Sequence, residues 1–130
     1  MEIKFRGKRL DNGEWEYGYL VKYGFAGKEK YYIVPSHASA LYSFEVDPAT
    51  VGQYTGLKVK NGMEIYEGDI ILADWRSTPC KWKVYRDNET QYWDIESHHG
   101  ILEGLYDYHK YCIVIGNVHE HPELLEEPPC

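Results

Sequence analysis

Apolar and polar side chains alternate along much of this chain, and turn-forming residues separate the alternating runs. The clearest run spans residues 15–22, where aromatic or aliphatic side chains occupy every second position, at Trp15, Tyr17, Tyr19 and Val21. That period of two is typical of a β-strand with one buried face. Residues 3–10 precede this run, and the intervening Asp11-Asn12-Gly13 sequence predicts a β-hairpin with an Asn-Gly turn.

Further short strands are predicted wherever β-forming runs lie between Gly, Pro, Asn or Asp residues. They span residues 31–34, 41–46, 53–57, 63–66, 70–75, 81–86, 91–96 and 111–118. The run from Cys112 to Ile115 is apolar throughout, which predicts burial on both faces. Gly18, in the middle of a strand, indicates a bulge or the close approach of another backbone. Residues 101–110 fit neither the strand nor the helix period, so their conformation stays open.

Two short helical turns are expected. In Asp47-Pro48-Ala49-Thr50 the aspartate is placed to cap a turn whose first position is proline. Residues 122–127 can form another, which Pro128-Pro129 ends, and the tail, residues 122–130, is expected to fray. No linker, low-complexity segment or repeat divides the chain, so residues 1–130 are expected to form a single domain.

The predicted fold is mainly β and antiparallel, built as a small barrel or as two packed sheets. The sequence Glu67-Gly68-Asp69-Ile70-Ile71 resembles the strand entry of small SH3-like barrels, where glycine makes a tight bend before a core strand. That likeness concerns fold alone and carries no function.

The chain is rich in tyrosine, with 13 tyrosines and 4 tryptophans against 3 phenylalanines. Tyr and Trp suit half-buried sheet faces, because the ring packs against the core while the polar group stays accessible to solvent. Five of these aromatic residues fall in or beside neighbouring predicted strands: Trp75, Trp82, Tyr85, Tyr92 and Trp93. Two interpretations are open: they form the core of the domain, or they form an exposed face that binds a protein partner or stacks on nucleic-acid bases or sugars.

The formal net charge is −7, from 14 Lys and Arg against 21 Asp and Glu. Affinity for nucleic acid comes largely from neutralising phosphates with basic side chains, so an acidic chain is at a disadvantage. Basic residues do cluster before the first turn, at Lys4, Arg6, Lys8 and Arg9. An aromatic surface on an acidic protein favours protein partners, including further copies of the chain, over polyanions.

The chain has three cysteines, Cys80, Cys112 and Cys130, with no Cys-x-x-Cys spacing. An odd set of this kind predicts reduced thiols in a cytoplasm. Cys80 follows Pro79 and is expected in a loop, as a lone surface cysteine. The basic N-terminus lacks the apolar segment of a signal peptide, and no apolar run approaches the ~20 residues of a membrane span. We therefore expect a soluble cytoplasmic protein.

The strongest candidate for a metal site is His119-Glu120-His121. On a strand, imidazoles at positions i and i+2 point the same way and can share a metal. Further ligands would have to come from His98, His99, His109 or Asp107. The alternative is a polar strand end with exposed histidines. Because no residue set has the pattern of an activated nucleophile, a carboxylate acid–base pair or a phosphate loop, neither catalysis nor a cofactor is expected.

The densest turn chemistry lies in residues 46–71, VDPATVGQYTGLKVKNGMEIYEGDII. Residues 52–57, 60–62 and 64–70 of this segment resemble the central motif of the YopX family. Residues 4–6, 15–18, 116–117 and 122–125 extend the resemblance over most of the chain. YopX proteins are small, are encoded by phages and prophages, chiefly of Gram-positive bacteria, and have no established biochemical role. At positions 119 and 121 the family pattern more often has Tyr and Asn, so the resemblance implies no shared metal site.

These observations lead to three hypotheses on function. The leading one is a non-catalytic accessory protein of a phage or prophage that acts through contacts with another protein or with further copies of itself. The second is a nucleic-acid-binding module that uses the aromatic face. The third is a small metal-dependent hydrolase that uses His119, Glu120 and His121.

Overall fold

The computed structural model describes residues 3–35 and 42–126. Within these residues the chain forms two antiparallel sheets joined by loops and 3₁₀ turns, and neither sheet closes into a barrel. The prediction of a mainly β, antiparallel fold is therefore confirmed. By its contacts the chain divides into two compact units, Met1–Tyr54 and Thr55–Cys130, which are described in turn. Folding of the whole chain as a single domain stays a prediction.

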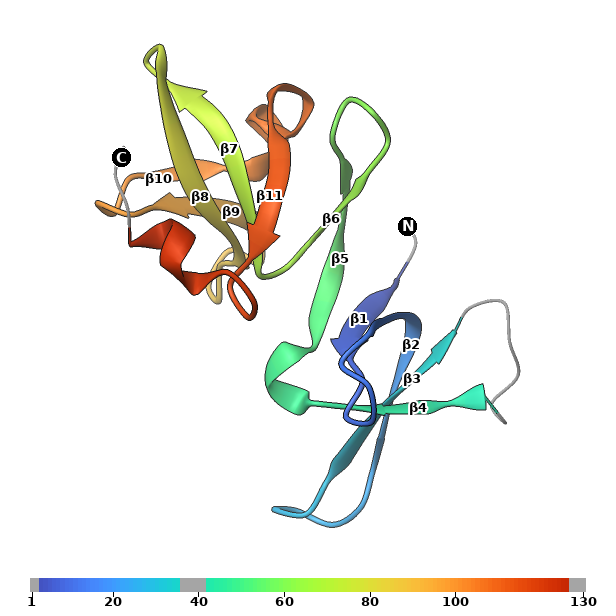
Figure 1. Cartoon of the computed structure of the whole chain (residues 1–130). Helices are drawn as coiled ribbons and strands as arrows, with labels where there is room; N and C mark the ends of the chain where they lie inside the picture. Colours follow the sequence, from blue (N-terminus) through green and yellow to red (C-terminus); the bar gives the residue numbers. More distant parts are fainter. Residues whose placement is uncertain (1–2, 36–41, 127–130) are drawn as a thin grey trace. The chain divides into compact units, whose positions relative to one another are not determined.

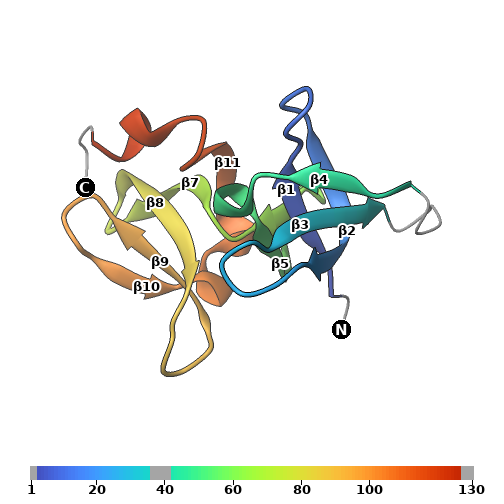
Figure 2. The same cartoon turned by 90° about the horizontal axis from the view of Figure 1, so that it is seen from below.

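The sheet of the first unit has the strand order β4-β3-β2-β1-β5 (Figures 1 and 2). Its strands are β1 (Phe5–Lys8), β2 (Trp15–Tyr23), β3 (Lys30–Pro35), β4 (Phe44–Val46) and the first residues of β5 (Gly52–Lys58). The predicted hairpin is confirmed, because β1 and β2 pair in an antiparallel ladder. Part of the strand predicted over residues 41–46, and the segment 36–40 before it, lie outside the described residues.

The predicted turn after β4 is also confirmed, as η2 (Pro48–Thr50). Its cap is Asp47, whose carboxylate accepts a hydrogen bond from the N–H of Ala49 at 3.0 Å. The Thr50 hydroxyl in turn accepts from the backbone N–H of Lys8 at 2.9 Å. The turn therefore links the chain after β4 to the end of β1.

Glycines let the strands of the first unit curl around a small interior. A Cβ on Gly18 would lie 2.0 Å from the carbonyl oxygen of Val34, and one on Gly7 would lie 2.8 Å from a methyl carbon of Val46. Ile33 and Val46 fill this interior without any exposed surface. The interpretation of Gly18 as a point of close backbone approach is confirmed.

The second unit begins within β5, which is followed in the sheet by β6 (Glu64–Tyr66). A second sheet of five strands has the order β10-β9-β8-β7-β11 (Figure 1). Its strands are β7 (Asp69–Trp75), β8 (Thr78–Arg86), β9 (Trp93–Ser97), β10 (Leu102–Gly104) and β11 (Ile113–Asn117). The 3₁₀ turns η3 (Leu105–Asp107), η4 (His109–Tyr111) and η5 (Pro122–Leu125) lie beside these strands in the chain. The helical turn predicted over residues 122–127 is confirmed at its first four residues.

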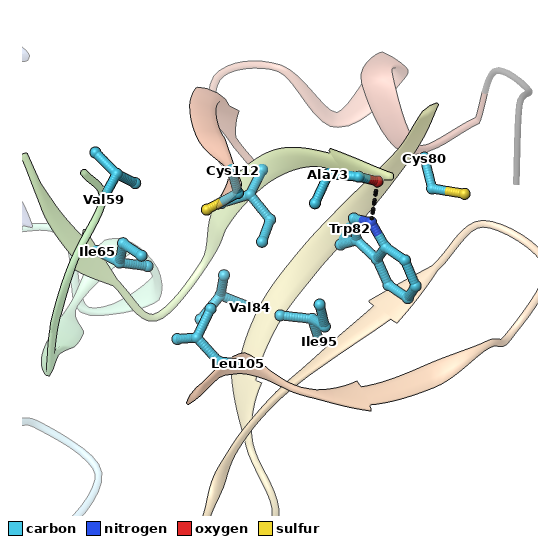
Figure 3. Packing of buried hydrophobic residues seen from close by; sticks show 10 residues of the cluster. Val59, Ile65, Ala73, Cys80, Trp82, Val84, Ile95, Leu105 and Cys112 are labelled. Carbon is cyan, nitrogen blue, oxygen red and sulfur yellow. Dashed lines mark hydrogen bonds between the residues drawn. The ribbon is translucent and has the colours of Figure 1, made fainter. Parts of the chain in front are cut away.

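One face of the five-stranded sheet carries the core of the second unit (Figure 3). Trp82 on β8 has no exposed surface, and its indole N–H donates a hydrogen bond to the carbonyl of Ala73 at 3.0 Å. The buried cluster comprises Val59, Ile65, Ile71, Ala73, Cys80, Trp82, Val84, Ile95, Leu105 and Cys112. Because burial of one large apolar side chain contributes roughly 1.5–3 kcal/mol, this cluster is the main source of stability in the unit.

The prediction that Cys80 is an exposed thiol in a loop is wrong. A two-residue turn at Arg76 and Ser77 reverses the chain before Pro79, so Cys80 already lies on β8. Both turn residues have a positive φ, of 50° and 67°. Cys80 has no exposed surface and is disulfide-bonded, so the expectation of reduced thiols is wrong for this residue.

The apolar run before Gly116 is not buried on both faces, as its composition predicted. Its strand, β11, lies at the edge of the sheet and pairs with β7 alone, and Ile113 is 55% exposed. Residues 101–110, which the sequence left open, contain β10, η3 and the first residues of η4. Of the tail, residues 122–125 form η5, and residues 127–130 lie outside the described part of the chain.

Candidate functional site

The five aromatic residues predicted to form a binding face do not share one exposed surface. Trp82 lies in the core, without exposed surface. Tyr85 follows it by three positions on β8, and because alternate residues of a strand point to opposite faces, Tyr85 points away from that core. Tyr92 precedes β9 and is 72% exposed. The core interpretation therefore holds for Trp82, and the predicted face is divided between two sides of the sheet.

Trp75 and Trp93, the other two residues of that set, are half-buried and have cationic neighbours. The guanidinium of Arg76 lies 4.5 Å from the ring centroid of Trp75, and that of Arg86 lies 5.6 Å from the ring centroid of Trp93. The indole N–H of Trp75 also donates to the carboxylate of Glu103 at 3.3 Å. These rings already have partners in the chain, so they are poor platforms for stacking a ligand.

Tyr85 faces an acidic environment. Burial raises the pKa of its hydroxyl, and the charges of Asp94, Glu96 and Asp87 raise it further. Burial also raises the pKa of Asp94, with a smaller effect from the charge of Asp87. Lys83, on the same side of β8, lies 3.9 Å from the carboxylate of Glu96, so this side of β8 and β9 carries charges of both signs.

The segment His119-Glu120-His121 lies in a turn after β11 rather than on a strand, so its two imidazoles are not placed by strand geometry. The side-chain oxygen of Asn117 accepts hydrogen bonds from the N–H groups of His119, at 3.0 Å, and Glu120, at 2.9 Å. The Nδ1 atom of His121 accepts from the backbone N–H of Asn117 at 3.3 Å. The polar residues of this segment therefore hold the turn together. In residues 3–35 and 42–126, no group of three or more His, Cys, Asp or Glu residues is placed to hold a metal ion.

An exposed aromatic surface lies in the first unit instead. Tyr17, Tyr19 and Tyr23 point to the same side of β2, with 43%, 58% and 64% of their surface exposed. Val21 lies between them, and the register with β3 places Tyr32 opposite Val21 and Val34 opposite Tyr19. We call the following residues the tyrosine face: Tyr17, Tyr19, Val21, Tyr23, Tyr32 and Val34.

On the side of β2 opposite the tyrosine face, the backbone of β3 leaves no room for a side chain at position 18. Gly18 lies on that inner side, against the backbone of Val34. Within the tyrosine face, Tyr23 and Tyr32 contact each other edge to face, with ring centroids 5.6 Å apart. An aromatic pair of this kind contributes about 0.5–1.5 kcal/mol beyond area burial. The contact therefore restricts the orientation of the two rings in the free protein.

Basic residues flank the tyrosine face. Lys30 lies opposite Tyr23 at one end of the β2–β3 ladder, and Arg6 of β1 lies opposite Tyr17. Arg6 is buried beneath Trp15, with its guanidinium 4.7 Å from the ring centroid.

The alternation in residues 15–22 predicted one buried face without deciding which side it is. Gly18 was the available signal, because a position without a side chain marks the side of closest packing.

Among the described residues, no helix has the length and the apolar character that a membrane span requires. A comparison with family models matches residues 4–126 to the model described as YopX protein. A search of curated proteins found no match. Among solved structures, the chain resembles the crystal structure of protein EF1440 from Enterococcus faecalis, with 22% sequence identity and a TM-score of 0.51. That alignment covers 96% of this chain and 99% of the other, and it shows a shared fold.

Proposed function

The chain belongs to the YopX family, and from this premise we propose that it is a non-catalytic accessory protein of a phage or prophage, which binds another protein in the bacterial cytoplasm. The tyrosine face is the proposed binding surface. Self-association through the same face is one form that this binding can take.

The observation that carries the proposal is the row of exposed tyrosines on β2. Tyr17, Tyr19 and Tyr23 are ordinary strand residues, yet about half or more of each side chain is open to solvent. Tyrosine is enriched in protein interfaces, because its ring buries a large apolar area while its hydroxyl still hydrogen-bonds. Residues of this type supply a large share of the binding free energy where an interface excludes water from them.

The charge of the chain supports a protein partner over a polyanion. The net charge is −7, which opposes the approach of a long nucleic acid. The aromatic surface on which the nucleic-acid hypothesis rested is also divided, since Trp82 lies in the core and Tyr85 faces Asp94 and Glu96. The tyrosine face thus supports a protein-binding role better than either alternative.

The proposal is tested with a double variant, Tyr19→Ser with Tyr23→Ser, in a pull-down from induced host cells. The matched control is Tyr92→Ser with Tyr106→Ser, which removes two tyrosines of similar exposure, 72% and 75%, from the second unit. We expect the wild type and the control to retain one protein at near-stoichiometric level, and the Tyr19 and Tyr23 variant to lose it. Light scattering on the same three proteins gives their molar masses. A larger mass that only the Tyr19 and Tyr23 variant loses identifies self-association through the tyrosine face.

Equal capture by both double variants would overturn the assignment of the tyrosine face. A wild-type protein that captures no protein and stays monomeric at its highest soluble concentration would overturn the protein-binding function itself. Circular dichroism of each variant verifies that the sheet is intact, because exposed surface substitutions usually change stability by less than about 0.5 kcal/mol.

A further inference from the structure

A basic cavity lies in the second unit, away from every residue of the tyrosine face in sequence. Its volume is about 410 Å³, within the usual range for small-molecule sites. The lining residues are Lys58, Val59, Lys60, His109, Lys110 and Tyr111. Three of these six residues are cationic and none is acidic, although the chain as a whole has seven more acidic than basic residues.

The cavity is built by joining the end of β5 to η4. The Nδ1 atom of His109 lies 2.7 Å from the carbonyl oxygen of Lys58, and since a carbonyl only accepts, the imidazole donates here. The ring is therefore fixed in orientation, with Nε2 as its second polar atom. Val59 follows β5 and Cys112 follows η4. Both residues are buried, with 5% and 6% of their surface exposed, and both belong to the core cluster.

A tight turn holds two of the lysines on one wall. The N–H of Val59 donates to the carbonyl of Met63 at 2.9 Å, and the N–H of Gly62 donates to the carbonyl of Val59 at 2.9 Å. Val59 is thereby anchored inward, while Lys58 and Lys60 on either side of it are exposed. Lys58 is the last residue of β5 and Lys60 begins the turn, and both lysines line the cavity beside Val59.

The opposite wall presents aromatic rings beside a cation. Tyr111 lines the cavity and is 80% exposed, and Tyr106 is 75% exposed with its ring centroid 5.7 Å from that of His109. Lys110 lies between His109 and Tyr111 in the chain, at the same cavity. Cations next to exposed rings are the combination that binds a phosphate together with a base.

We propose that this cavity binds the phosphate-bearing unit of a nucleotide. Lys58, Lys60 and Lys110 contact the phosphate, and the Tyr111 ring packs against the base. Lysine binds phosphate as a point charge, and the three lysines of this lining supply three such charges at one cavity. The ligand is either a free nucleotide or a unit of a single strand, since both offer the same groups.

The test is an NMR titration of the full ¹⁵N-labelled chain with adenosine 5′-monophosphate at low salt, with adenosine as the matched ligand that lacks the phosphate. We expect the monophosphate to shift the amides of residues 58–60 and 109–111, and adenosine to shift them far less. A parallel titration with oligothymidylate distinguishes a free nucleotide from a single strand as the ligand. Binding more than about tenfold tighter than the monophosphate assigns the site to a strand, and equal or weaker binding assigns it to the free nucleotide.

The variants Lys60→Gln and Lys110→Gln are each expected to weaken binding of the monophosphate roughly three- to tenfold, because each removes one charge-assisted contact. The matched control, Lys28→Gln, removes an exposed lysine of the first unit and is expected to leave the affinity unchanged. Tyr111→Ser should also weaken binding of the monophosphate, whereas Tyr92→Ser should leave this binding unchanged. The spectra themselves report whether each variant is folded. Absence of shifts in the wild type, equal shifts with adenosine, or equal weakening by Lys28→Gln would overturn the proposal.

Discussion

The Oδ2 atom of Asp69 accepts a hydrogen bond from the backbone N–H of Tyr66 at 2.8 Å, and 2% of the Asp69 surface is exposed. The bond spans the turn that connects β6 to β7. Gly68, between the two residues, has a φ of 89°, and its own N–H donates to the carbonyl of Val84 at 2.9 Å. A side chain and a glycine conformation together therefore define the entry of the chain into the five-stranded sheet.

Replacing this carboxylate is expected to destabilise the protein. Asp69→Ala leaves the Tyr66 N–H buried without its acceptor, and an unsatisfied buried donor costs about 1–3 kcal/mol. The free energy of unfolding, measured by urea denaturation, should fall by that amount. Asp74→Ala is the matched control, because Asp74 lies on the same strand but is exposed, and should change stability by less than about 0.5 kcal/mol. Equal losses in the two variants would show that the bond to Tyr66 contributes nothing specific.

Gly18→Ala is expected to disrupt the hairpin of the first unit. The new Cβ would lie 2.0 Å from the carbonyl oxygen of Val34, so β2 and β3 have to move apart. Overpacking of this kind costs typically about 1–3 kcal/mol. Gly104→Ala is the control, since its Cβ would meet nothing closer than 3.9 Å. Thermal unfolding followed by circular dichroism compares them, and a Gly18→Ala protein as stable as Gly104→Ala would contradict the close approach of β3.

Short turn-forming sequences show why much of the fold could be predicted. Asn-Gly, Asp-Pro and Glu-Gly-Asp sequences restrict the backbone locally, so the turn after β1, η2 and the entry of β7 followed from a few adjacent residues. The turn between β7 and β8 was missed because it uses Arg76 and Ser77, which lack the composition that marks a turn with positive φ.

The candidate surface was predicted less well than the fold. Trp82 and Tyr85 lie three positions apart on one strand, and grouping them by sequence distance ignored the alternation of faces. The tyrosine face depends on which side of β2 is covered, a choice made by the approach of β3 to Gly18. The basic cavity depends on a bond between Lys58 and His109, residues 51 positions apart, which no local pattern reveals.

The two compact units are expected to unfold together, as the single-domain prediction requires. β5 runs across their boundary, and its residues pair with β1 at Gln53 while Thr55 donates to the Ile65 carbonyl at 2.8 Å. Unfolding of either unit therefore removes the hydrogen bonds at one end of β5, a strand that also belongs to the other unit. Calorimetry of Gly18→Ala and Asp69→Ala should show one transition that both substitutions lower. Two transitions, each sensitive to only one substitution, would contradict the single domain.

Ser77→Gly is expected to stabilise the protein. Ser77 has a φ of 67°, a conformation that costs a residue with a side chain roughly 1–2 kcal/mol, whereas glycine adopts it freely. Part of this gain is lost to the greater freedom of glycine in the unfolded chain, so we expect a net increase of about 0.5–1 kcal/mol. Arg76 is left unchanged because it stacks on Trp75. Thr78→Gly, one residue further on and within β8, should destabilise instead, and denaturant midpoints distinguish the two outcomes.

The buried thiol of Cys112 gives the stability a pH dependence at high pH. Burial raises the pKa of this thiol from 9.0 to about 11, because the thiolate is disfavoured in the apolar core. The folded protein therefore keeps the proton that the unfolded chain loses, and this contribution is complete below pH 9. It declines as the pH rises from 9 towards 11.

Cys112→Ala removes this contribution, so the difference in unfolding free energy between wild type and variant should be constant below pH 9 and shrink between pH 9 and 11. The comparison with the variant is needed because burial also raises the pKa values of Tyr85 and Tyr108, whose effects are common to both proteins. Alkylation by iodoacetamide followed by peptide mass spectrometry provides a second measurement. Cys112 should react slowly in the folded chain at pH 8 and rapidly in denaturant, since the thiolate is the nucleophile. Rapid reaction in the folded chain, or a constant difference up to pH 11, would show that the thiol is accessible to solvent.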